Sequence, residues 1–225
     1  MIPHGLIRPV YSVTSLVVYE FCPLQYFYAF VKRIAPPRTP AMVAGVTIHK
    51  LLSDHFRQPH LLLPDAPQSI MEMFQTFQAS RFNVPPVVSE KSFKLSMDRG
   101  EVRGRIDVVL PSGEAGLEIV DFKSGTLRSR QELQGNLQLP LYALAASELW
   151  RTAANELSYT YYFLGPQHEE SFRASDLEFQ LLRERVAGLM ELIERGNFTP
   201  SPDCGCYACA HQATGSSLGS RSRSG

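Results

Sequence analysis

The sequence predicts an α+β or α/β fold in which helices flank a small mixed β-sheet. Two observations lead to this fold class. In the N-terminal third, apolar residues recur at the spacing of amphipathic helices, whereas the middle of the chain changes to the alternating pattern of strands. Strand-like and helical segments then follow one another toward the C-terminal end. The length of 225 residues suits one such domain.

The N-terminal part is expected to be helical. Helices are expected at 14–21, 23–31, 42–57 and 67–81. A Thr/Ser cap precedes the first helix, and Pro23 occupies the favoured first position of the second. In the third, Ile48, Leu51, Leu52 and His55 share one face, which predicts an amphipathic helix.

The middle and the C-terminal part supply the sheet and two further helices. Strands are expected at 87–95, 101–110, 117–122 and 157–164, with a helix at 133–150. Asp-Arg-Gly and Pro-Ser-Gly turn signals separate the first three strands. The last helix begins at a capping-box pattern of Ser175 and Glu178, reaches Arg195 and stops at Gly196.

Composition indicates the domain organisation and the cellular location. We expect a single domain over 1–211 and a disordered tail over 212–225, which is rich in Gly, Ser and Arg. Lys+Arg and Asp+Glu balance at 22 each, so the net charge indicates no partner. The sequence shows neither a signal peptide nor a membrane-spanning stretch, and we expect a cytoplasmic location and no membrane partner.

Two carboxylates and an ammonium group are expected to meet at the ends of neighbouring strands. Asp107 lies in the strand 101–110, and side-chain alternation places Asp121 and Lys123 on one face of the next strand. Carboxylates bind a hard cation such as Mg²⁺, which polarises a phosphate, while lysine can orient water and offset charge on phosphate oxygens. For an isolated Asp-x-Lys pattern, ordinary surface charges are the alternative.

Four motifs in a fixed order resemble the PD-(D/E)XK nuclease superfamily. They are Gly-Val-Thr-Ile-His at 45–49, Gly-Arg-Ile-Asp at 104–107, Asp-Phe-Lys-Ser-Gly at 121–125 and Gln-Leu-Pro-Leu-Tyr at 138–142. The set is similar to the RecB-type branch, which includes CRISPR-associated exonucleases. The resemblance covers nearly the whole folded chain and implies a restriction-endonuclease-like core and a hydrolase acting on phosphodiester bonds.

The same resemblance implies roles for single residues. The implied catalytic residues are Asp107, Asp121, Lys123, Gln138 and Tyr142. The implied metal ligands are His49, Asp107, Asp121 and Phe122, and Mn²⁺ would tolerate the histidine nitrogen better than Mg²⁺. Gln138 would assist at the active site, and Tyr142 would contact DNA or the catalytic lysine. The alternatives are a core or surface histidine at position 49 and an amphipathic helix whose polar side contains Gln138 and Tyr142.

Two weaker features accompany the motifs. Glu90 resembles an acidic residue that precedes the sheet in the family, with a solvated strand-end charge as the alternative. Five basic residues could form a rim that tracks a phosphate backbone, with a solvated charged face as the alternative. They are Arg103, Arg105, Lys123, Arg128 and Arg130.

The four cysteines are Cys22, Cys204, Cys206 and Cys209. In a chain with no export signal, such a cluster suggests metal or iron–sulfur ligation before disulfides. It resembles the staple of many RecB-type nucleases, in which four thiolates hold a [4Fe–4S] cluster. The Cys-x-Cys-x-x-Cys spacing is more compact than in that family, so a structural zinc site and free cysteines stay as alternatives.

These features predict a metal-dependent DNA nuclease, an exonuclease of DNA repair, recombination or defence that uses Mg²⁺ or Mn²⁺. DNA is the expected substrate. The chain has no phosphate-cradling loop of a motor, so it either acts alone or works beside a helicase or another repair or CRISPR-adaptation protein. The alternative is a catalytically idle nucleic-acid-binding or assembly module of a helicase–nuclease complex. The intact Asp107, Asp121 and Lys123 argue against an idle module.

Overall fold

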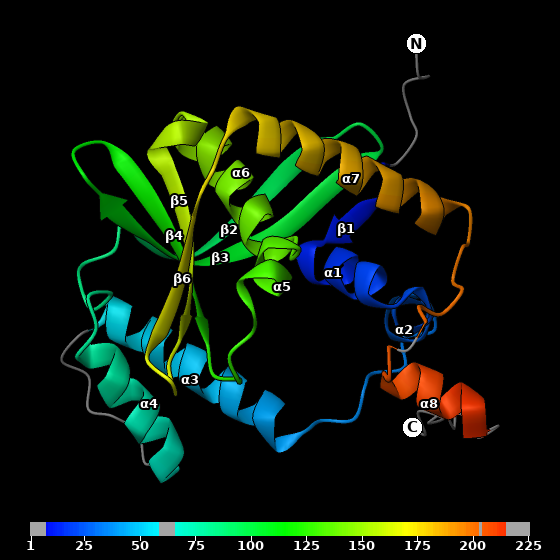
Figure 1. The fold of residues 1–225 in the computed structure, drawn as a ribbon, viewed down its shortest axis with the longest axis horizontal. Coiled ribbons are helices and arrows are strands. Elements are labelled where there is room, and N and C mark those ends of the chain that lie inside the picture. Colours follow the sequence, from blue (N-terminus) through cyan, green and yellow to red (C-terminus); the bar gives the residue numbers. More distant parts are fainter. Residues whose placement is uncertain (1–7, 59–65, 203, 215–225) are drawn as a thin grey trace, which may run out of the picture.

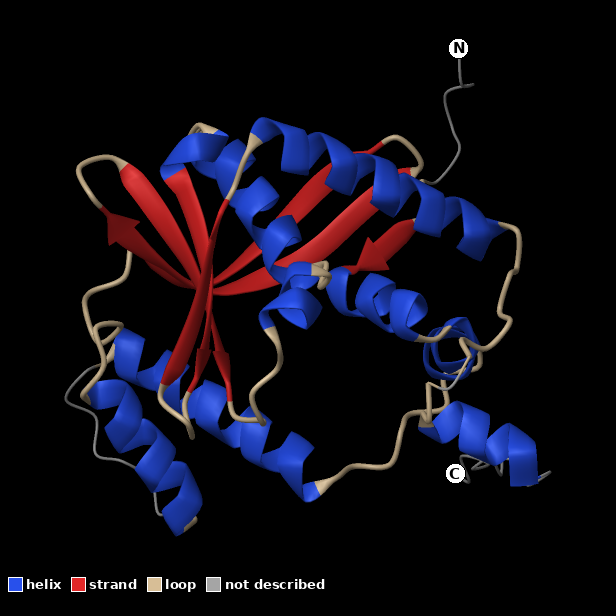
Figure 2. Cartoon of the chain, viewed as in Figure 1, coloured by secondary structure: helices blue, strands red, loops and turns tan. Residues whose placement is uncertain are grey.

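A mixed β-sheet forms the centre of the molecule, with helices on both sides (Figures 1 and 2). The computed structural model describes residues 8–58, 66–202 and 204–214. Its strands are β1 (Val10–Ser12), β2 (Val88–Met97), β3 (Gly100–Ser112), β4 (Gly116–Lys123), β5 (Leu157–Phe163) and β6 (His168–Arg173). The predicted fold class is therefore confirmed.

The strands follow the order β1-β3-β4-β5-β6, and β2 pairs with the other edge of β3. The pairs β2–β3, β3–β4 and β5–β6 are antiparallel, whereas β1–β3 and β4–β5 are parallel. The four strands expected from the sequence are present within a few residues of their predicted bounds. Strand β6 was not predicted, because His-Glu-Glu-Ser-Phe-Arg contains a single apolar residue, Phe172.

Helices cover the two faces of the sheet. They are α1 (Val13–Phe21), α2 (Pro23–Tyr26), α3 (Pro40–Arg57), α4 (Gln68–Gln78), α5 (Arg130–Gln134), α6 (Gln138–Trp150), α7 (Asp176–Glu194) and α8 (Tyr207–Thr214). Short π- and 3₁₀-helical turns occur at Phe27–Val31 and Ala154–Glu156. One apolar layer joins the sheet to α1, α6 and α7, and a second layer joins it to α3 and α4. Figure 1 shows α3 and α4 below the strands, away from α6 and α7.

The helix expected at 133–150 is in fact two helices. Ser129 accepts a hydrogen bond from the Glu132 main chain, and the Glu132 carboxylate accepts one from the Ser129 N–H, so a complete capping box begins α5. The chain then breaks, and the side chain of Asn136 accepts a hydrogen bond from Gln138 N at 2.8 Å where α6 begins. Local capping therefore divides a segment whose apolar pattern predicts one continuous helix.

The capping box expected at Ser175 and Glu178 forms only in part. Ser175 caps α7 by accepting a hydrogen bond from Glu178 N at 3.2 Å. The Glu178 carboxylate instead accepts one from the hydroxyl of Tyr159 at 2.5 Å. A tertiary contact with the sheet thus replaces the local return bond that the pattern predicts.

The two ends of the described chain meet away from the sheet. Helix α8 packs beside α2, and its last residues, 212–214, belong to the segment that was expected to be a tail. The remainder of the predicted tail, 215–225, lies outside the described residues. In the part of the chain that the structure describes, no helix combines the length and apolar character needed to cross a membrane.

Candidate active site

Strand β4 presents an acidic and a basic side chain toward α6. Ile119 packs in the layer of α6 and Val120 in the layer of α3, so alternation directs Asp121 and Lys123 to the α6 side. Asp121 is 1% exposed. Its Oδ2 atom lies 2.5 Å from Nζ of Lys123, whose side chain is one-third exposed. Asp121 and Lys123 therefore lie on one face of β4, as predicted, and Asp121 is the more buried of the two.

Asp107 joins this pair where β3 and β4 separate. The antiparallel register of the two strands ends at the pair Val108 and Val120. Asp107 and Asp121 are the next residues on their strands, and β1 pairs with the same edge of β3 further along. The sheet therefore opens at this point, with one carboxylate on each side of the opening.

The main chain of Phe122 faces the same opening. The carbonyl of Lys123 accepts a hydrogen bond from Leu164 N on the β5 side. Because main-chain groups alternate along a strand, the carbonyl of Phe122 points to the β3 side, beyond the last β3–β4 pair. The Phe122 ring is buried between the sheet and α3, so the carbonyl is the group that could serve as a metal ligand.

Helix α3 brings His49 to Asp107. The helix begins at Thr39, which accepts a hydrogen bond from Met42 N, and Ile48, Leu51 and Leu52 anchor it on the sheet. His49 Nδ1 lies 3.2 Å from Oδ2 of Asp107. The structure therefore brings together the predicted histidine and the first predicted aspartate.

Gln138 connects the acidic and basic groups from the start of α6. Its Oε1 accepts a hydrogen bond from Lys123 Nζ at 3.2 Å, and its Nε2 donates to Asp121 Oδ1 at 3.1 Å and to the Tyr142 hydroxyl at 3.3 Å. Tyr142 is 7% exposed and packs edge-on against Phe93. It therefore reaches the lysine through Gln138, and its burial speaks against the DNA contact that was the other expected role.

Packing explains two of the motif glycines. A Cβ atom at Gly104 would lie 2.5 Å from the ring of Phe93, which is closer than real contacts allow. A Cβ atom at Gly45 would lie 3.2 Å from Oγ of Ser124, in the loop just after Lys123. Gly104 therefore leaves room for the Phe93 ring over β3, and Gly45 lets α3 approach the loop that follows β4.

The electrostatics of this cluster suit a cation. Burial raises the pKa of Asp121, the Lys123 ammonium lowers it, and the charge of Asp107 raises it again, so that it stays above its ordinary value. Burial lowers the pKa of His49, but contact with Asp107 outweighs burial and leaves it raised. Among the described residues, Oδ2 of Asp107 and Oδ2 of Asp121 accept no hydrogen bond, although each has a cationic group at ion-pair distance. Buried carboxylate oxygens of this kind fit a divalent metal ion.

Comparison with protein families shows the superfamily of the chain. The model of the PD-(D/E)XK nuclease superfamily matches residues 62–214. The chain belongs to this superfamily. A model of exonuclease V, described as a 5′ deoxyribonuclease, matches residues 8–83. The resemblance seen in the motifs and the expected enzyme class, a deoxyribonuclease hydrolysing phosphodiester bonds, are therefore confirmed.

Solved structures share the fold of this nuclease. A candidate exonuclease from Eubacterium rectale has a TM-score of 0.61 at 12% identity, covering 89% of this chain and 86% of that chain. The protein SSO0001 has a TM-score of 0.53 at 17% identity, covering 93% of this chain and 87% of that chain. At these identities the likeness concerns the fold alone. No curated protein matches the chain.

Tyr161 is a further residue of the candidate site and lies outside the four sequence motifs. In the parallel register of β4 and β5 it lies opposite Asp121. Its ring centre is 5.7 Å from Nζ of Lys123, within the range of a cation–π interaction. Burial, and then the charge of Asp121, raise its pKa, so the phenol stays neutral. No local pattern could have revealed this contact, because it depends on which strands pair and in what register.

The predicted basic rim is not continuous. Arg130 stacks on Phe172, with 4.4 Å between the guanidinium carbon and the ring centre, and pairs with Glu170 at 2.5 Å. Arg103 forms an ion pair with Glu101 on its own strand. These arginines hold structural contacts, so they do not form a free cationic surface.

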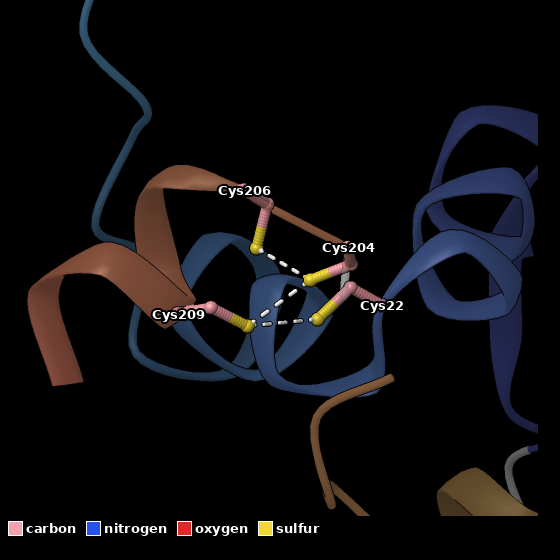
Figure 3. A group of neighbouring side chains, drawn as sticks. All are labelled: Cys22, Cys204, Cys206 and Cys209. Carbon is pink, nitrogen blue, oxygen red and sulfur yellow. Dashed lines mark hydrogen bonds between the residues drawn. The ribbon is translucent and has the colours of Figure 1, made fainter. Parts of the chain in front are cut away.

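The four cysteines of the nuclease form a second cluster, which joins the two ends of the described chain (Figure 3). Cys22 precedes α2, and the other three lie in or just before α8. Sulfur separations are 3.7 Å between Cys22 and Cys209, 3.1 Å between Cys204 and Cys209, and 3.5 Å between Cys204 and Cys206. All four sulfurs lie within 4.8 Å of one another. Among the described residues, no other set of three or more potential ligands is gathered so closely, so the carboxylate site is the more open of the two.

The sulfur positions can be compared with the two expected metal groups. Thiolates bind a single zinc ion at about 2.3 Å, which places tetrahedral sulfurs about 3.8 Å apart. The three separations given above, 3.1–3.7 Å, lie slightly below this value, and all four sulfurs lie within 4.8 Å of one another. In a [4Fe–4S] cluster each thiolate binds a different iron, so the sulfurs must lie further apart than around one ion. The ligand set fits both groups, whereas the spacing fits the single ion.

The thiols are electrostatically coupled. Burial raises the pKa of Cys22, but main-chain hydrogen bonds near Ser201 and Gln25 and the neighbouring thiols lower it to about 7. Burial and the neighbouring thiols raise the pKa of Cys209. One thiolate therefore forms readily and opposes ionisation of the others. A bound cation would relieve that repulsion, which is further support for a metal group here.

Proposed function

We propose that this protein is a metal-dependent DNA exonuclease that hydrolyses phosphodiester bonds at Asp107, Asp121 and Lys123. The observation that carries the proposal is a pair of buried carboxylate oxygens, Oδ2 of Asp107 and Oδ2 of Asp121, whose polar contacts among the described residues are the ion pairs with His49 and Lys123. This donor set suits Mg²⁺ or Mn²⁺, and the histidine nitrogen favours Mn²⁺.

We assign the ligands to both sides of the opening between β3 and β4. His49, Asp107, Asp121 and the carbonyl of Phe122 would hold the ion, which supplies polarisation of the phosphate and of the attacking water. An open site is appropriate, because Mg²⁺ binds few protein carboxylates and keeps room for water and substrate phosphate.

The remaining residues handle charge and orientation. The Lys123 ammonium, fixed by Asp121 and Gln138, can donate hydrogen bonds to a phosphate oxygen, where negative charge increases during attack by water. Gln138 has its amide bound on three sides, which limits the positions that the ammonium can take. Tyr142 contacts Gln138 and Tyr161 contacts Lys123, so both tyrosines are positioning residues.

The exonuclease assignment is supported by the match to exonuclease V and by the structural likeness to a candidate exonuclease. A role in repair, recombination or defence, and a helicase or CRISPR-adaptation partner, stay predictions. The rival function is an idle DNA-binding or assembly module. The rival offers no reason for an ammonium and two carboxylates to be held together at the cost of burial.

The test uses end-labelled single- and double-stranded DNA and a closed circular single strand, with Mg²⁺, Mn²⁺ or chelator. We expect metal-dependent loss of the linear substrates and survival of the circle. Labels on the 5′ and 3′ ends report polarity. The Lys123→Ala variant is the control against a contaminating nuclease. DNA binding without cleavage under every metal condition would favour the idle module.

We also propose that the cysteine cluster is a structural metal site. As they stand, the sulfur separations match one tetrahedral ion, and a [4Fe–4S] cluster requires the group to open. Visible absorbance together with iron, zinc and acid-labile sulfide analysis of anaerobically purified protein distinguishes the two. If the purified protein contains neither iron nor zinc, the cysteines are free thiols and the proposed metal site is wrong.

A further inference from the structure

One face of β2 and β3 is open beyond the proposed metal site. Along these strands, Phe93, Leu95, Val102 and Ile106 pack in the layer of α6. Alternation places four polar side chains on the opposite face, where all are exposed. They are Ser92, Lys94, Arg103 and Arg105. The layer of α3 and α4 contains no residue from this stretch, and Figure 1 shows β2 and β3 extending away from both helices.

This open face leads directly to Asp107. The register pairs Lys94 with Arg103, and Ser92 with Arg105. Two residues further along β3 comes Asp107, about 7 Å from Arg105 along the strand. A polymer lying on the face would therefore reach the cluster after passing Arg105.

Arg105 is held by a residue with an unusual backbone. Glu90 has a φ of 55° within β2, a left-handed conformation that residues other than glycine rarely adopt. Its position in the register is opposite Asp107, between the pairs Ser89–Val108 and Lys91–Ile106. Its carboxylate lies 2.7 Å from Nε of Arg105. Backbone conformations of this kind persist where the surrounding structure enforces them, and they concentrate at functional sites.

The exposures of the two partners differ in a way that suits ligand binding. The Glu90 side chain is 12% exposed, whereas that of Arg105 is 63% exposed. The ion pair engages Nε, and the two terminal nitrogens carry four further N–H donors. A guanidinium presented in this way can bind a phosphate through two of them, and fixing it beforehand reduces the entropy lost on binding.

We propose that Arg105, held by Glu90, is a substrate-positioning residue that binds the phosphate next to the one cleaved, so that the nucleic-acid strand crosses the open face of β2 and β3. The inference rests on the proposed nuclease function and adds the direction from which the strand enters the site. Phosphate contacts fix the register of a nucleic acid on a protein, so this contact determines which bond meets Lys123.

The test compares steady-state cleavage of a short oligonucleotide by Arg105→Ala, Arg105→Lys, Glu90→Gln and Arg103→Ala. Arg103 is the matched control, since it is on the same strand and face, is also exposed, and lies two residues further from Asp107. We expect Arg105→Ala to raise KM about tenfold, the usual effect of one charge-assisted hydrogen bond, with kcat within about twofold. Arg103→Ala should change KM much less.

Two further readouts distinguish positioning from a general charge effect. In Arg105→Ala, the slope of log KM against the logarithm of the salt concentration should decrease by the amount that one phosphate contact contributes. Arg105→Lys should restore the wild-type slope, whereas its KM should return only part of the way to the wild-type value. Glu90→Gln should raise KM in the wild type and have no further effect in Arg105→Ala, because it acts through the arginine. The melting temperature of each variant is compared with that of the wild type, so that misfolded variants are excluded.

Equal effects of Arg103→Ala and Arg105→Ala, an unchanged KM in Arg105→Ala, or a loss confined to kcat would each overturn the proposal. Binding of a fluorescein-labelled oligonucleotide in Ca²⁺, measured by anisotropy, keeps the test independent of cleavage. If the wild type binds and never cleaves, the proposed function fails. The affinity of Arg105→Ala relative to Arg103→Ala then still decides the role of Arg105.

Discussion

Replacement of Cys22 by serine should destabilise the protein by removing the link between its two ends. Cys22 is fully buried among Leu24, Cys206 and Ala208, and serine has nearly the same shape. The substitution therefore removes one thiolate and creates little cavity. Three cysteines would remain on one short segment, unable to close the chain around the nuclease core.

The magnitude follows from the length of the chain that is closed. Cys22 and Cys204 enclose about 180 residues, for which the loop-closure estimate is at most about 5 kcal/mol. Native domains are stable by about 5–15 kcal/mol, so the link accounts for a large share of the total. For a domain of this size, 1 kcal/mol corresponds to about 2–4 °C, so the upper limit of the expected fall in melting temperature is about 10–20 °C.

The assay is a thermodynamic cycle between substitution and metal removal. Melting temperatures are measured by circular dichroism for wild type and Cys22→Ser, each before and after anaerobic dialysis against a chelator. We expect the chelator to lower the wild type to the level of the variant and to leave the variant unchanged. A metal-loaded variant that melts like wild type would refute the reasoning. If the variant melts at a lower temperature and the chelator leaves the melting temperature of the wild type unchanged, the effect of the substitution is due to packing.

Other variants test the remaining contacts. Lys123→Ala should lower cleavage at least about a hundredfold with an unchanged circular dichroism spectrum, whereas Lys50→Ala, an exposed lysine of α3, should cleave normally; equal losses would contradict the assignment. His49→Ala should lose most activity at low metal concentration and recover in part at high Mn²⁺; a loss that no metal titration changes would indicate packing instead. Glu118→Gln should cost about 2 kcal/mol in urea unfolding, because the Arg81 guanidinium loses its buried, doubly bonded partner but is itself half exposed. Since the pKa of Glu118 is lowered in the fold, the wild-type advantage over Glu118→Gln should begin to shrink below about pH 4.5 and disappear as the pH falls through the lowered pKa. An advantage that persists at still lower pH would exclude this cause.

The elements that the sequence predicts well are those determined by neighbouring residues. Strands β2, β3 and β4 have alternating apolar residues and strong turn signals between them, and they appear close to the predicted bounds. Helix α3 has a proline at its start and a regular apolar face. In both cases local preference and tertiary packing favour the same structure, so the local pattern suffices.

The errors occur where a tertiary contact or a cap overrules the apolar pattern. Glu178 bonds to Tyr159 in the sheet and so leaves its predicted capping box incomplete. Ser129 and Glu132 form the complete box in a segment where one long helix was expected. Strand β6 is an edge strand whose exposed residues are polar or charged, which protects a sheet edge but hides the strand from a search for apolar alternation.

The residues of the candidate site also fall into two groups: those that belong to a local motif and those that strand pairing brings into contact. His49, Asp107, Asp121, Lys123 and Gln138 could be predicted because each belongs to a motif of a few residues on one element. The structure places His49 beside Asp107, and Lys123 and Gln138 beside Asp121. The surroundings of these residues could not be identified in this way. Tyr161 meets Lys123 through the parallel register of β4 and β5, and Glu90 meets Arg105 diagonally across β2 and β3. Such contacts carry no signature in the local sequence, because the same tyrosine or glutamate shifted by one residue would face the opposite side of the sheet. The motifs therefore predict the chemistry of the candidate site, whereas the contacts that hold Lys123 and Arg105 depend on strand register.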